Sequence, residues 1–176
     1  MFEHHSKKIS VREKENRVKV VTFGSYHSGK TTFIRSIDPK TRSTEARNLD
    51  GETTVAFDLG VKEYRGYKIY LYGTPGQDRF VTAREVVSFG LHAGIVIVDS
   101  VRGITGFEKQ ILDEMKAHNI PCVVIANKMD LPGASLEKVV EGCGADTCVI
   151  PVSASTGQGV NVVLDKLAEI ASQIES

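Results

Sequence analysis

Short runs of β-branched and aromatic residues alternate along this chain with amphipathic stretches of helical length. The runs cover residues 17–23, 53–61, 68–72, 94–100, 121–127 and 148–153. This alternation is typical of an α/β fold, in which helices cover the faces of a mostly parallel sheet. The chain has 176 residues, enough for one domain with a sizeable core. We therefore expect six strands within residues 17–176, after a flexible N-terminal arm over residues 1–16.

The second and third runs are expected to pair as an antiparallel hairpin. Only a short segment separates them, and its Arg65-Gly66 pair suits a tight turn. The other runs are expected to be parallel, because longer connections join them.

Three stretches are predicted to be helices. The last carries apolar residues spaced three and four apart, namely Val160, Val163, Leu164, Leu167, Ile170 and Ile174. A second covers residues 105–118 and precedes the fifth run, as a crossover helix would. A third begins near Lys30 and is short, because Asp38-Pro39 stops it. The polar stretch between Pro39 and Thr53 has almost nothing to bury, so we expect a structureless loop that acts as a switch.

The composition of the chain indicates which kinds of partner and which cellular compartment to expect. Lysine plus arginine equals aspartate plus glutamate at 22 each, which argues against nucleic acid or an anionic membrane as the main partner. No apolar run approaches the roughly 20 residues of a membrane span, and the N-terminus lacks a signal-peptide pattern. We expect a cytoplasmic protein without a lipid anchor. The three cysteines, Cys122, Cys143 and Cys148, are expected to be reduced thiols.

A glycine-rich loop lies between the first run and the helix near Lys30. Its sequence GSYHSGKT fits the phosphate-binding pattern GxxxxGK(S/T). In that pattern the glycines let backbone N–H groups converge on a phosphate, and the helix N-terminus adds a favourable dipole. The residues predicted to bind are Gly24, Ser25, Tyr26, His27, Ser28, Gly29, Lys30, Thr31 and Thr32.

The last residues of this loop have distinct predicted roles. Lys30 neutralises β- and γ-phosphate oxygens, Thr31 holds Mg²⁺ through its hydroxyl, and Thr32 reaches the α-phosphate. The alternative is a glycine-rich turn that arose by chance, but a strand before it and a helix after it favour phosphate binding.

The segment Asn127-Lys128-Met129-Asp130 follows the fifth run directly and predicts the base. Asp130 can accept two hydrogen bonds from N1 and the exocyclic amino group of guanine, which adenine cannot offer. Asn127 is expected to pin the loop and the O6/N7 side of the base, and the Lys128 stem to lie along the ring. Alone, this string would read as a polar turn; about a hundred residues after a phosphate loop, it indicates guanine.

The order of motifs GSYHSGKT, TTVAFDLG, GTPGQDRF, NKMD and SAS resembles that of the Ras-like small GTPases, particularly their small prokaryotic members. The resemblance covers residues 17–174. It implies a three-layer P-loop G domain of strand order 2-3-1-4-5-6, with strand 2 antiparallel, and GTP or GDP as ligand. It also implies a switch in which the γ-phosphate and Mg²⁺ order two loops that relax after hydrolysis. The segment Ser153-Ala154-Ser155 matches the one in which the Ala154 N–H contacts guanine O6.

The same resemblance implies roles in the two switch loops. Thr54 matches the Mg²⁺-binding threonine, with Thr53 as the alternative register. Gly76 matches the glycine whose N–H meets the γ-phosphate, and Gln77 the catalytic glutamine that orients the attacking water. The family usually has aspartate where this chain has Gly73, so a carboxylate that anchors a Mg²⁺ water is missing and Mg²⁺ should bind more weakly.

Two departures from the family leave alternatives open. Asp58 and Asp99 are candidates to replace the missing carboxylate, against a structural or solvent-facing role for each. Tyr26 and His27 stand where Ras has small glycines. A large side chain there either shields the γ-phosphate from a partner's arginine or points to solvent.

The sequence thus predicts a GTP/GDP-binding switch with slow intrinsic GTP hydrolysis. The alternative is a nucleotide-dependent binding module that holds GTP without significant hydrolysis. A phosphotransferase or ATPase is disfavoured, because no acceptor or lid motif is visible. The implied partners are effector, exchange and activating proteins, none of which the sequence identifies.

Overall fold

The computed structural model describes residues 16–47, 54–74 and 90–175. In chain order the elements are β1 (Asn16–Phe23), α1 (Lys30–Ile37), β2 (Arg42–Arg47), β3 (Thr54–Tyr64), β4 (Tyr67–Gly73), β5 (Ala93–Asp99), α3 (Gly106–Ala117), β6 (Cys122–Asn127), α4 (Leu136–Cys143), β7 (Val149–Pro151) and α5 (Val160–Ile174). The arm predicted over residues 1–16 lies almost entirely outside the described residues, and Asn16 already begins β1.

The strands form one sheet of order β2-β3-β4-β1-β5-β6-β7. Strands β4, β1, β5, β6 and β7 are parallel to one another, whereas β3 is antiparallel to β4. Without β2, this is the predicted order 2-3-1-4-5-6, which is confirmed together with the antiparallel hairpin. Arg65 and Gly66 turn that hairpin with φ angles of 48° and 81°, the left-handed pair that a tight two-residue turn requires.

Part of the stretch predicted to be a structureless loop is a strand. Residues Arg42–Arg47 form β2, which pairs antiparallel with β3 at the edge of the sheet. The prediction was wrong here because an edge strand is held by backbone hydrogen bonds, so it needs no apolar periodicity. Residues 48–53 of that stretch lie outside the described residues.

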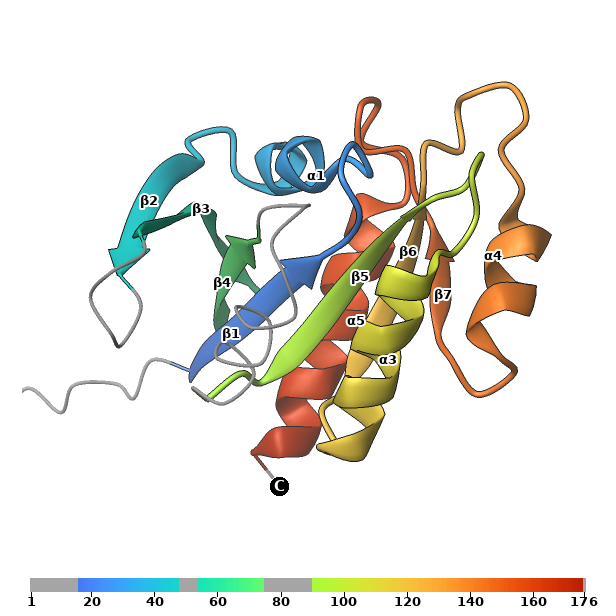
Figure 1. Cartoon of the computed structure of the whole chain (residues 1–176). Helices are drawn as coiled ribbons and strands as arrows, with labels where there is room; N and C mark the ends of the chain where they lie inside the picture. The colour runs from blue at the N-terminus through green and yellow to red at the C-terminus, as the bar shows by residue number, and fades with distance from the viewer. Residues whose placement is uncertain (1–15, 48–53, 75–89, 176) are drawn as a thin grey trace, which may run out of the picture.

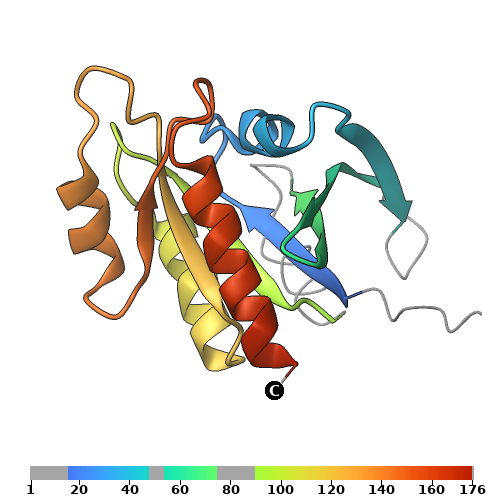
Figure 2. The same ribbon diagram turned by 180° about the vertical axis from the view of Figure 1, so that it is seen from behind.

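Two hydrophobic clusters place helices on opposite faces of the sheet. Helices α1 and α5 pack on one face through residues such as Phe33 and Leu167, while α3 and α4 pack on the other through Ile111 and Val139. Figure 1 shows α3 in front of the sheet, and Figure 2 shows α5 covering it from behind. The sequence did not predict α4, a short helix whose Ser135 cap accepts a hydrogen bond from Lys138 N.

The parallel arrangement brings loops from distant parts of the chain to one edge of the sheet. β1, β5 and β6 are neighbouring parallel strands, so the loops after Phe23, Asp99 and Asn127 meet at their carboxyl ends. None of the helices within the described ranges has the length and apolar character that crossing a bilayer would need. The three cysteines carry free thiols.

Candidate nucleotide-binding site

Close packing explains two of the glycines in the loop between β1 and α1. A Cβ on Gly24 would lie 2.5 Å from the Ile97 carbonyl oxygen and 2.6 Å from Ser28 Oγ. Gly29 has a φ of +99°, and a Cβ there would lie 2.3 Å from Asn127 Nδ2. Only glycine fits both positions without displacing backbone or the Asn127 amide.

Lys30 is the cation at the start of α1. Its buried ammonium donates hydrogen bonds to the carbonyl oxygens of Gly24, at 2.7 Å, and Ser25, at 2.9 Å. Burial lowers the pKa of Lys30 to about 8, although the carboxylates of Glu108 and Asp58 act in the opposite direction. A bound phosphate would supply a further negative charge and favour the protonated ammonium.

A small pocket joins the phosphate loop to the predicted guanine motif. Its volume is about 210 Å³. Its lining residues are Gly29, Thr32, Asn127, Lys128, Asp130, Leu131, Ala154 and Ser155. Seven of these eight belong to the set predicted from sequence to bind nucleotide, with Leu131 as the addition. The fold thus assembles three segments, separated along the chain, around one hollow.

Asn127 ties these segments together. Its Nδ2 donates to the Ser28 carbonyl at 2.9 Å, and its Oδ1 accepts from Ala154 N at 3.0 Å. Both ends of the amide are therefore used within the protein, and the buried Asn127 sets the spacing between the loop and the Ser153–Ser155 segment. The sequence predicted the pinning role, while the contact with the base stays a prediction.

The neighbouring charged residues of this motif are also held in place. Asp130 accepts a hydrogen bond from Ser153 Oγ at 2.8 Å, which orients one carboxylate oxygen in the pocket. Lys128 has a left-handed φ of 65°, and its ammonium lies 2.8 Å from Asp99 Oδ2. Burial would raise the pKa of Asp99, but the hydrogen bonds from Lys128 and from two backbone amides outweigh it, so the net direction is down.

The contact between Asp58 and Thr31 provides an alternative to the carboxylate missing at Gly73. Asp58 on β3 is the register partner of Gly73 on β4, and its Oδ2 accepts a hydrogen bond from Thr31 Oγ1 at 2.5 Å. A hydroxyl and a carboxylate, both hard oxygen donors, therefore meet beside the phosphate loop and fit a Mg²⁺ ion. Asp99 instead holds Lys128, so of the two candidates the structure places Asp58 at the predicted metal threonine.

Other predicted residues are placed less completely. Gly76 and Gln77 lie outside the described residues. Thr54 is the first residue of β3 and pairs with Arg47. Its metal-binding role stays a prediction.

The two bulky residues of the phosphate loop lie on its outer side. Tyr26 is 55% exposed and its ring centroid is 3.7 Å from that of His27, which is also exposed. His27 has a left-handed φ of 61°, a backbone conformation that glycine adopts more readily than residues with a side chain. The exposed rings are available to a partner or to solvent.

Besides Leu131, sequence reasoning missed Glu108. This acid lies in the first turn of α3 and is only 2% exposed, yet it accepts hydrogen bonds from the phosphate-loop residue Ser25. The signal that points to it is the capping-box spacing of Thr105 and Glu108 at the start of a helix.

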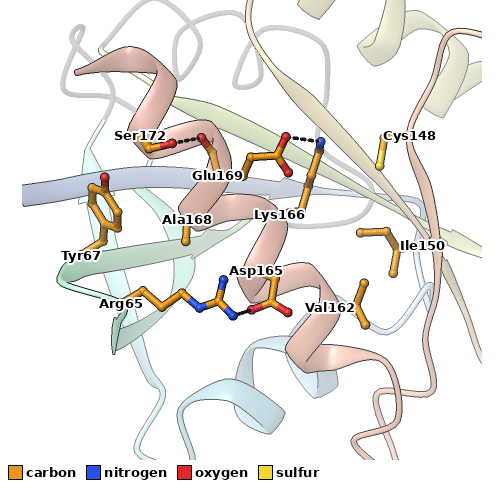
Figure 3. Close-up of a pocket in the computed structure, with 10 residues that line it drawn as sticks. All are labelled: Arg65, Tyr67, Cys148, Ile150, Val162, Asp165, Lys166, Ala168, Glu169 and Ser172. Carbon is orange, nitrogen blue, oxygen red and sulfur yellow. Dashed lines mark hydrogen bonds and ion pairs between the residues drawn. The ribbon is translucent and has the colours of Figure 1, made fainter. Parts of the chain in front are cut away.

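A larger hollow lies away from these motifs, between α5 and the turn that joins β3 to β4. This open hollow has a volume of about 580 Å³, and Figure 3 shows its charged side chains facing one another. Arg65 pairs with Asp165 at 2.9 Å, and Lys166 pairs with Glu169 at 3.0 Å. None of its lining residues belongs to the predicted nucleotide site. The nucleotide site is therefore identified by the chemistry of its lining residues and not by the volume of the hollow.

Comparison with known proteins agrees with this geometry. The sequence profile described as elongation factor Tu GTP binding domain matches residues 15–173. The chain is 31% identical over 163 residues to an uncharacterized protein of Methanocaldococcus jannaschii, a match that covers 93% of this chain and 98% of that one. It is 29% identical over 191 residues to translation initiation factor IF-2 of Thermotoga sp. (strain RQ2), covering 99% of this chain but only 27% of the factor.

Solved structures show the same fold. The G domain of the Thermotoga maritima FeoB iron transporter superposes with a TM-score of 0.69 at 21% identity, over 88% of this chain and 99% of that one. The Arl6 BBS3 small GTPase of Trypanosoma brucei, solved with a bound GppNp analogue, gives a TM-score of 0.65 at 24% identity, over 89% and 98%.

The strand order, the phosphate loop and the pocket that joins it to the guanine motif define a P-loop GTPase of the small G-domain class. The resemblance to small GTPases that the motifs suggested is confirmed. Within that class the chain belongs to the family of the elongation factor Tu GTP binding domain. Membership supports guanine-nucleotide binding, and GTP hydrolysis in general.

Proposed function

We propose that this G domain is a Mg²⁺-dependent GTP/GDP switch with slow intrinsic hydrolysis. The observation that carries the proposal is the hydrogen bond from Asn127 to the phosphate-loop carbonyl of Ser28. It sets the base-recognition segment beside the phosphate loop, so that one nucleotide can bridge both. Asp130 would then read guanine and Lys30 would hold the β- and γ-phosphates.

Thr31 and Asp58 would help to hold Mg²⁺. The Thr31 hydroxyl would be a direct ligand, and Asp58 would accept a hydrogen bond from a water on the ion, as the missing aspartate at Gly73 would have done. When bound, Mg²⁺ neutralises charge on the phosphate oxygens. Asp58 lies next to Thr31 already, which supports this assignment.

Intrinsic hydrolysis is expected to be slow, at about 10⁻³ s⁻¹ or below, because the arginine that stabilises the transition state is expected to come from an activating protein. Gln77 would orient the attacking water. Gln77→Leu should slow hydrolysis further. The measurement is single-turnover release of phosphate from GTP, with and without Mg²⁺. A variant that keeps the full rate would show that another group positions the water.

The same assay tests the alternative, a binding module that holds GTP without significant hydrolysis. GTP that stays intact over many hours, while it remains bound, would favour that module over the switch. Effector, exchange and activating proteins are the partners that a switch requires, and their identity must come from binding experiments.

Tyr26 is the residue expected to affect how strongly an activating protein stimulates hydrolysis. Its exposed ring lies at the rim of the phosphate loop, and we expect it to hinder an arginine that approaches the γ-phosphate. Tyr26→Gly should therefore change the intrinsic rate of hydrolysis by no more than about twofold, but raise the rate stimulated by an activating protein about tenfold. A guanidinium additive can replace the activating protein in this measurement. An unchanged stimulated rate would mean that the ring only faces solvent.

A further inference from the structure

Glu108 is a buried acid whose carboxylate receives donors from two different segments. One oxygen accepts from the backbone N–H of Ser25, at 3.0 Å, and from the Ser25 hydroxyl. The other accepts from the backbone N–H of Thr105, at 2.8 Å, and from the Thr105 hydroxyl. Burial would raise the pKa of Glu108, but these hydrogen bonds outweigh it and hold the pKa below its usual value. The carboxylate is therefore ionised and fully occupied.

Ser25 is also held from its other side. Its carbonyl oxygen, together with that of Gly24, accepts the two hydrogen bonds of the Lys30 ammonium. A continuous chain of hydrogen bonds thus runs from Glu108 through the Ser25 peptide to the phosphate-binding lysine. The Ser25 N–H is directed at Glu108, so it is not among the loop amides available to a phosphate.

We propose that Glu108 is a positioning residue for nucleotide binding, which fixes the Gly24–Ser25 limb of the phosphate loop against the first turn of α3. The proposal rests on the proposed nucleotide function and adds a residue that no motif of the phosphate loop contains. Its consequence is reciprocal coupling: a bound nucleotide that orders the loop also stabilises the start of α3, because Thr105 shares the same carboxylate.

The first experiment is a double-mutant cycle on GDP affinity, measured by titration of the whole chain below its unfolding temperature. Glu108→Gln keeps the shape of the side chain and one acceptor oxygen, and we expect about tenfold weaker binding; Glu108→Ala should lose more. Ser25→Ala should also weaken binding, by less than Glu108→Gln, because the Ser25 N–H remains bonded to Glu108. The two losses should not add in the double variant, since both act through one contact.

A second readout separates positioning from a purely structural role. The Ser25 amide signal in the NMR spectrum of labelled protein should move in Glu108→Gln, as its carboxylate partner is lost. Glu141→Gln removes the same charge from an exposed position on α4 and should change neither the signal nor the affinity. If Glu108→Ala fails to fold, Glu108→Gln and Ser25→Ala carry the test.

The outcomes are distinguishable from failure of the proposed function. If the unaltered protein does not bind GDP, the nucleotide function fails. If it binds GDP and the Glu108 and Ser25 variants bind equally well, with only a lower melting temperature, the positioning role is overturned and the nucleotide function stands. Additive losses in the double variant would likewise overturn the coupling through Ser25.

Discussion

Replacing Asp130 by asparagine should move the base preference of this protein from guanine to xanthine nucleotides. The unaltered protein should prefer GDP over ADP by at least about a hundredfold, because the wrong base would cover the polar groups of the pocket and leave them unpaired. In Asp130→Asn the carboxylate that accepts two hydrogen bonds is lost. GDP should therefore weaken by about a hundredfold, while xanthosine diphosphate, which offers an acceptor where guanine has its amino group, should bind better.

Titration of labelled GDP, ADP and xanthosine diphosphate measures these preferences. The substitution is well matched to the structure, because an asparagine oxygen can still accept the hydrogen bond from Ser153 Oγ. Asp146→Asn, at an exposed position outside the pocket, is the control and should leave all three affinities unchanged. Comparable affinities for GDP and ADP in the unaltered protein would rule out Asp130 as the base-selecting residue.

The second large effect is expected at Asp58. Asp58→Asn should raise the free Mg²⁺ needed to slow GDP dissociation by about 10- to 100-fold, the usual cost of losing a residue that orients a metal-bound water. The measurement is the GDP dissociation rate against free Mg²⁺. Asp113→Asn, an exposed acid on α3, controls for the loss of one charge. If Asp58→Asn does not change how the GDP dissociation rate depends on free Mg²⁺, Asp58 is excluded from the metal site.

Gly73 provides the complementary variants. Restoring the family's aspartate alone is not expected to tighten Mg²⁺, since a Cβ on Gly73 would lie 2.7 Å from Ile34 Cδ1 and 3.7 Å from Asp58 Oδ2. The new carboxylate would crowd Asp58 and repel it. In an Asp58→Ala background the same Gly73→Asp change should recover part of the Mg²⁺ dependence. If this double variant recovers no Mg²⁺ dependence, a carboxylate at position 73 on β4 cannot replace the one at position 58 on β3.

Local sequence was sufficient for the parts of this protein that depend on neighbouring residues. The phosphate loop is a contiguous strand, turn and helix, so the spacing of Gly24, Gly29 and Lys30 predicts its place. The stripe along α5 was confirmed from Val160 to Ile170, because helical periodicity is a local property, whereas Ile174 at the end of the helix is exposed. The Arg65-Gly66 turn was confirmed because its two left-handed residues are adjacent. The strand order followed from the family resemblance.

Tertiary structure decided the contacts between segments that are distant in sequence. Asp58 meets Thr31, and Glu108 meets Ser25 across 83 positions, because strand register and the packing of α3 bring them together. Sequence periodicity does not indicate which carboxylate will contact a distant hydroxyl or amide, because all aspartates and glutamates carry the same group. Strand β2 was missed for a related reason: backbone hydrogen bonds to an edge hold it, and these depend on the neighbouring strand β3 rather than on its own side chains.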